Sequence, residues 1–167
     1  PPIGCVNTSI TFTNTTVSGY GQSCNQNAIF TWNFGDGTPT ITTPLSSPQN
    51  INHTFTTPGT YTVTLTAQNF CGTTTKTQQI CIEPPLTPLF TLNTDSGCIP
   101  LAITATNNTV LTNQCSTPTY LWSVSYVAAN CGTTITPIPN QTTPNASYNF
   151  TVPGIYTITL TTTNSCG

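Results

Sequence analysis

The sequence predicts an all-β protein, and three observations carry that prediction. First, 41 of the 167 residues are Thr, a β-branched residue that fits a pleated and half-exposed surface. Second, the usual helix formers are nearly absent, because the chain has no Met and only four charged side chains. Third, short segments of alternating apolar residues and Thr are separated by Gly and Pro turns, a pattern typical of a β-sandwich.

Six segments alternate apolar residues with Thr or other polar residues, so each predicts a strand with one buried face and one solvated face. In chain order they are 10–13, 30–34, 61–65, 101–104, 120–124 and 156–160. Turn residues separate the strands at 35–37, 58–59, 69–72 and 153–154. The regular spacing of these strands favours small sandwiches over a single large sheet.

An internal repeat divides the chain near Pro84-Pro85. The matching pairs are Gly4-Cys5 with Gly97-Cys98, Cys24 with Cys115, Trp32 with Trp122, 61–65 with 156–160, and Cys71-Gly72 with Cys166-Gly167. Residues 86–93 have no counterpart in the first copy, and residues 73–83 have none in the second. We therefore expect a module over 1–83 that lacks its first strand and a module over 84–167 that lacks its last, as in a segment of a longer tandem array.

The charge content excludes several classes of function. One Lys cannot form the basic surface that nucleic acid requires, and no apolar stretch is long enough to cross a membrane. Three acidic residues far apart in sequence and one His do not supply the paired groups that acid–base catalysis needs, so we expect neither an enzyme nor a bound cofactor. Eight Cys in such a chain indicate disulfides and an oxidising compartment, and zinc is disfavoured because no C-x-x-C pair occurs.

Two segments resemble a known family. Residues 32–37 (WNFGDG) are similar to the W-D-F-G-D-G signature of PKD (polycystic kidney disease) domains. Residues 53–65 resemble the H-x-Y…P-G-x-Y-x-V-x-L segment of that family. The second copy keeps Trp122, 148–150, 153–154 and 156–160, but departs at Ser123-Val124-Ser125. The resemblance implies two immunoglobulin-like (PKD-like) β-sandwiches in tandem, each of about 80–95 residues with a Trp in its core.

The implied immunoglobulin-like topology also places the cysteines. It implies Cys24–Cys71 at one end of the first sandwich and Cys5–Cys81 at the other. Equivalent positions imply Cys115–Cys166 in the second. Cys98 would pair with a residue of the missing last strand or, alternatively, with Cys131.

Several residues are candidates for a binding site. Asp36 could ligate Ca²⁺, although a tight turn in which the side chain bonds its own backbone is the favoured interpretation. His53 could be a ligand or a base, but a structural role is favoured. Tyr20, Phe70 and Tyr126 lie in or near expected loops, where they could stack on sugar rings or cap the edge of a core.

The resemblance implies a non-catalytic function outside the cell. PKD-like modules are extracellular spacers and accessories for adhesion or glycan binding, and Thr- and Asn-rich tandem copies resemble repeats of very large surface adhesins of gliding bacteria, for example of the SprB type. The expected partners are neighbouring repeats and polysaccharide or cell-surface glycans. Two alternatives stay open: an accessory module of a secreted hydrolase, and a polymerising subunit that receives strands from neighbouring chains.

Overall fold

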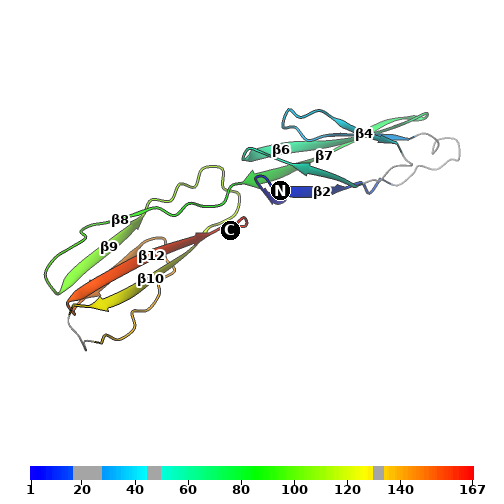
Figure 1. Ribbon diagram of the computed structural model, residues 1–167. Coiled ribbons are helices and arrows are strands. Elements are labelled where there is room, and N and C mark those ends of the chain that lie inside the picture. Colours follow the sequence, from blue (N-terminus) through cyan, green and yellow to red (C-terminus); the bar gives the residue numbers. More distant parts are fainter. Residues whose placement is uncertain (17–27, 45–49, 130–133) are drawn as a thin grey trace. The chain divides into compact units, whose positions relative to one another are not determined.

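A computed structural model describes residues 1–16, 28–44, 50–129 and 134–167, and these residues contain strands but no helix (Figure 1). The strands are β1 (Ile3–Cys5), β2 (Ser9–Thr13), β3 (Ile29–Asn33), β4 (Ile41–Pro44), β5 (Asn50–Thr54), β6 (Gly59–Asn69), β7 (Gly72–Glu83), β8 (Phe90–Leu92), β9 (Leu101–Asn107), β10 (Thr119–Ala128), β11 (Ala146–Phe150) and β12 (Gly154–Thr163). The predicted all-β class is confirmed. Unit 1 consists of Pro1–Pro84 with Asn113–Cys115, and unit 2 of Pro85–Thr112 with Ser116–Gly167.

Unit 1 is built from two sheets. One has the strand order β1-β7-β6-β3-β4, and the other pairs β2 with β5. All pairings are antiparallel except that of β1, which runs parallel to β7 and places Ile3 opposite Cys81. The module therefore opens with a short strand on the β7 sheet.

Alternate residues of each strand face the core of unit 1, and half of its buried residues are aromatic. Its buried residues are Trp32, Phe34, Phe55, Val63, Ile80 and Ile82. Trp32 is 5% exposed and its ring lies parallel to that of Phe34 at 6.3 Å. The expected core Trp of the sandwich is thus present.

Unit 2 repeats this plan with different edges. Strands β10 and β12 form one sheet, and the order β11-β9-β8 forms the other. Its buried core consists of Ile103, Ala105, Trp122, Ala146, Tyr148, Phe150 and Leu160. Trp122 is fully buried, and its indole Nε1 donates a hydrogen bond to the carbonyl of Thr143 at 3.0 Å.

The strand registers align the two units residue by residue. Ile10 on β2 faces His53 on β5, and Ile103 on β9 faces Tyr148 on β11. In this alignment β2, β3, β5 and β6 correspond to β9, β10, β11 and β12. Among the described residues, β7 has no counterpart in unit 2 and β8 has none in unit 1.

Candidate functional site

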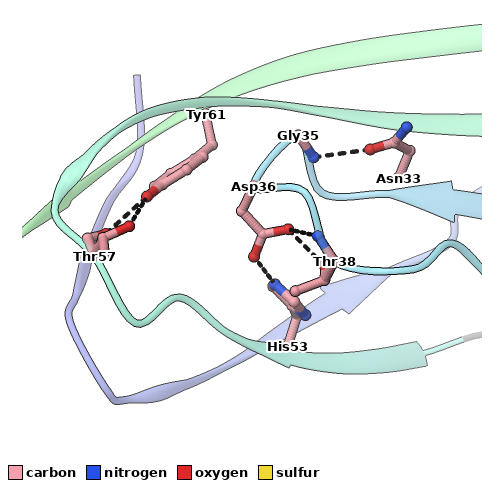
Figure 2. Close-up of polar contacts among 7 residues, drawn as sticks. All are labelled: Asn33, Gly35, Asp36, Thr38, His53, Thr57 and Tyr61. Carbon is pink, nitrogen blue, oxygen red and sulfur yellow. Dashed lines mark hydrogen bonds and ion pairs between the residues drawn. The ribbon is translucent and has the colours of Figure 1, made fainter.

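The PKD-like signature forms a tight turn directly after β3 (Figure 2). Gly35 and Gly37 have φ angles of 73° and 84°, a left-handed conformation that Gly adopts without steric cost. The side chain of Asn33 accepts a hydrogen bond from the Gly35 N–H at 2.9 Å. Asp36 Oδ1 accepts from Thr38 twice, from the main-chain N–H at 3.1 Å and from the hydroxyl at 2.6 Å. Asn33 and Asp36 thus each bond a main-chain group two residues on, which fixes the turn.

His53 anchors this turn to the opposite sheet. Its Nε2 lies 2.7 Å from Asp36 Oδ2, and the two side chains are 11% and 9% exposed (Figure 2). The imidazole stacks on Phe34 with ring centroids 3.8 Å apart and 3° between the planes. His53 comes from β5 and Asp36 from the turn after β3, so this contact joins the two sheets of unit 1.

The carboxylate of Asp36 is fully engaged within the protein. Burial alone would raise its pKa, but hydrogen bonds from Thr38 and His53 outweigh burial and lower the pKa below its ordinary value. Both carboxylate oxygens already have protein partners. The described residues also contain no group of three or more His, Cys, Asp and Glu side chains that could hold a metal ion. This geometry favours the structural interpretation of Asp36 and His53 over calcium binding.

The aromatic residues proposed for glycan contact differ in their environments. Phe70 follows the last residue of β6 and is 93% exposed. Tyr126, in contrast, donates its hydroxyl to the Pro153 carbonyl at 3.0 Å and packs its ring 4.9 Å from that of Tyr156. Tyr20 lies outside the described residues. Phe70 is therefore the accessible aromatic of the two that the structure describes.

The disulfide pairing differs from the predicted scheme. Cys81 is bonded to Cys115, so the predicted pairs Cys5–Cys81 and Cys115–Cys166 are both wrong. The parallel register of β1 and β7 explains the first error, because it puts Cys5 opposite Glu83, two residues beyond Cys81. The second error arises because Asn113–Cys115 belongs to unit 1, although it lies in the sequence of the second repeat. The neighbouring residue, Ser116, does lie near Cys166, the predicted partner of Cys115, because its hydroxyl accepts a hydrogen bond from the Ser165 N–H at 3.2 Å.

The other cysteines divide into two groups. Cys5, Cys71 and Cys166 are also disulfide-bonded, whereas Cys98 is an exposed free thiol. The alternative pair Cys98–Cys131 is therefore wrong. In unit 1 the equivalent Cys5 lies on β1 beside β7, and β7 has no counterpart among the described residues of unit 2. Cys24 and Cys131 lie outside the described residues, so Cys24–Cys71 stays a prediction.

Glu83 is a structural residue that the sequence analysis missed. It is completely buried, and its Oε2 accepts the Cys115 N–H at 2.7 Å. Its own carbonyl accepts the Val6 N–H at 3.1 Å, and the neighbouring Pro84 carbonyl accepts from the Gln114 side chain at 3.3 Å. A buried carboxylate is tolerated only where it is hydrogen-bonded, and the Cys115 N–H is one such donor. The one available signal in the sequence was an acidic residue at the end of an apolar strand in a chain with three acids.

Comparison with known proteins finds a family match for the first module. Residues 4–83 match the family described as PKD domain. No curated protein matches the chain. Among solved structures, the FN1–FN3 domains of chicken CNTN1 align at 16% identity over 99% of this chain and 58% of that one, with a TM-score of 0.36. The chain therefore spans less than two thirds of that structure.

A second solved structure is described as carbohydrate-binding modules of promiscuous specificity from the β-sandwich superfamily. It aligns at 14% identity over 99% of this chain and 81% of that one, with a TM-score of 0.39. The described residues contain no helix long and apolar enough to span a membrane. The family match over residues 4–83 includes the Trp32–Gly37 turn, so the sequence similarity and the turn geometry coincide in this segment.

Proposed function

We propose that this chain is a non-catalytic repeat segment of an extracellular bacterial adhesin or surface filament, as in adhesins of the SprB type. In this role it acts as a disulfide-stapled spacer whose surface binds glycans weakly and through many copies. The disulfides and the PKD-like domain support a location outside the cell, because disulfides persist in oxidising compartments. The observation that carries the binding part is the exposed surface of the β6–β7 hairpin, on which Lys76 is the single charged residue.

This hairpin presents hydroxyl and amide groups rather than charges. Every residue from Gly72 to Gln79 on β7 is exposed, and Lys76 is its one charged residue. Thr66 and Thr75 lie opposite each other on the two strands and share a hydrogen bond of 3.4 Å. Hydroxyl and amide groups in such a row donate and accept hydrogen bonds, as the hydroxyls of a polysaccharide do.

Phe70 adds an apolar group at the tip of the same hairpin. Its 93% exposure leaves the ring face open, and aromatic rings with open faces provide apolar contact surface at little entropic cost. Within the described residues, Phe70 is the one aromatic ring that is almost fully exposed in each copy, so we expect weak contacts that add up only when copies are linked.

A glycan array tests this proposal. The chain is displayed in eight or more copies on a particle and compared with the Phe70→Ser variant. Val110→Ser, in unit 2, is the matched control because Val110 is also exposed, at 69%. We expect binding to a set of polysaccharides that Phe70→Ser reduces and Val110→Ser leaves unchanged. Absence of binding at high copy number would contradict the binding role and leave only the spacer.

A further inference from the structure

An open groove lies beside β2 in unit 1, at the position that β8 fills in unit 2. The register alignment sets Ile10 against Ile103 and therefore Phe12 against Ala105. In unit 2, β9 pairs with β11 on one side and with β8 on the other, where Leu92 lies opposite Ala105 (Figure 1). In unit 1, β2 pairs only with β5 among the described residues.

Strand β8 completes the core of unit 2. Phe90 meets the fully buried Trp122 edge-to-face, with ring centroids 5.1 Å apart and 80° between the planes. The main chain extends the sheet past the end of β8, because the Asn93 N–H donates to the Thr104 carbonyl at 3.2 Å. The Asn93 side chain in turn accepts the Thr104 N–H at 2.8 Å. With β8 in place, Ile103 is only 4% exposed.

The same space in unit 1 is a groove of about 600 Å³. Apolar side chains from both sheets line it, including Ile10, Phe12, Trp32, Leu65 and Ile80. Ile10 and Phe12 are only half-buried. The indole Nε1 of Trp32 is buried and has no hydrogen-bond partner among the described residues, whereas the equivalent group of Trp122 has one.

We propose that this groove binds an extended peptide strand of the β8 type, antiparallel to β2. The alignment with β9 means that the main-chain groups of Thr11 and Thr13 face the incoming strand. An aromatic side chain, equivalent to Phe90, then packs against Trp32, as Phe90 packs on Trp122. The proposal goes beyond the glycan-binding role, because the partner is a peptide strand that pairs with the edge of β2, although Lys76–Gln79 of β7 also line the groove.

The groove also predicts the size of one residue in that strand. Phe12 replaces Ala105, the residue that faces Leu92 in unit 2. Because Phe is larger than Ala, less room remains for the residue that faces Phe12. We therefore expect a side chain smaller than Leu at that position to bind more tightly.

Synthetic peptides and the full chain test the proposal. The probes are the eight-residue peptide of sequence 86–93, the same peptide with Leu92→Ala, and a control peptide with Phe90→Ser. Binding is followed by amide hydrogen exchange and by chemical shifts in nuclear magnetic resonance. We expect saturable binding with at least tenfold slower exchange of the Thr11 and Thr13 amides, tighter for Leu92→Ala and at least tenfold weaker for Phe90→Ser.

Two results would overturn the proposal. One is no saturable shift up to about 1 mM of any of the three peptides, a range that covers dissociation constants of about 0.1 mM and tighter. The other is protection confined to the β7 edge at Lys76–Gln79, which would put the strand on the wrong sheet. A chain that carries the 86–93 sequence with Leu92→Ala and a Gly/Ser linker at its N-terminus provides an independent measurement. This fusion should melt at a higher temperature than a second fusion that carries both Leu92→Ala and Phe90→Ser. Equal melting temperatures of the two fusions would contradict the proposal.

Discussion

Removal of the Cys81–Cys115 disulfide should strongly destabilise unit 1. The bond closes a loop with a sequence separation of 34 residues. In the chain-entropy model a loop of this length contributes about 3.8 kcal/mol at 25 °C, since the entropy term is 2.1 + 1.5R ln n cal/mol/K. The double variant Cys81→Ser/Cys115→Ser leaves the main-chain N–H of residue 115 available to Glu83, so its effect isolates the covalent link. For a unit of this size the expected loss is on the order of 15–30 °C in melting temperature.

Urea unfolding followed by Trp32 fluorescence measures this change, in a Trp122→Phe background so that one unit is observed. Cys98→Ser is the matched control, because Cys98 is an exposed free thiol and its replacement should alter the free energy of unfolding by less than about 0.5 kcal/mol. A loss below about 1 kcal/mol for the double variant would refute the reasoning, because a closed loop of this length could not then be constraining the unfolded chain.

Three further predictions concern the turn and the two core tryptophans. Gly35→Ala should destabilise unit 1 by at least about 1 kcal/mol more than Gly37→Ala in urea unfolding, because a Cβ at Gly35 would lie 2.7 Å from a main-chain oxygen whereas Gly37 has nothing within 4 Å. Asp36 has a lowered pKa in the folded state, so its ionised side chain stabilises unit 1 above the ordinary pKa of 3.8, and this stabilisation is lost as the pH falls through the folded value. Asp36→Asn should therefore show a smaller fall in melting temperature at acid pH than the unaltered chain. Trp122→Phe should cost about 1 kcal/mol more in its unit than Trp32→Phe does, since among the described residues only the Trp122 indole has a hydrogen bond to lose, and equal losses in unfolding would contradict this assignment.

The strands could be predicted from the sequence because their signal is local. Alternation at 61–65 and 156–160 places one side chain in two toward the core, and β6 and β12 follow that pattern. The Trp32–Gly37 motif likewise predicted a turn, because Gly at 35 and 37 and the Asp side chain determine it over a few residues. The fold class follows from such local rules.

The cysteine pairing could not be predicted in the same way. It depends on the return of Asn113–Cys115 to unit 1, which is a long-range contact with no periodic signal. The predicted Cys5–Cys81 pair failed through a two-residue offset in a parallel register, a detail that alternation does not encode. Burial of Glu83 depends on that same returning segment, since its carboxylate accepts the Cys115 N–H. Long-range register, rather than strand identity, therefore limited the prediction of the site.

The dependence of binding on copy number tests the central claim most directly. One chain and an eight-copy display are compared by surface plasmon resonance on a polysaccharide that the array identifies. The account predicts that the single chain binds weakly and that eight copies gain at least about a hundredfold in apparent affinity, within the range that linked weak sites reach. Equal affinity for one copy and eight, or no binding by either, would contradict it.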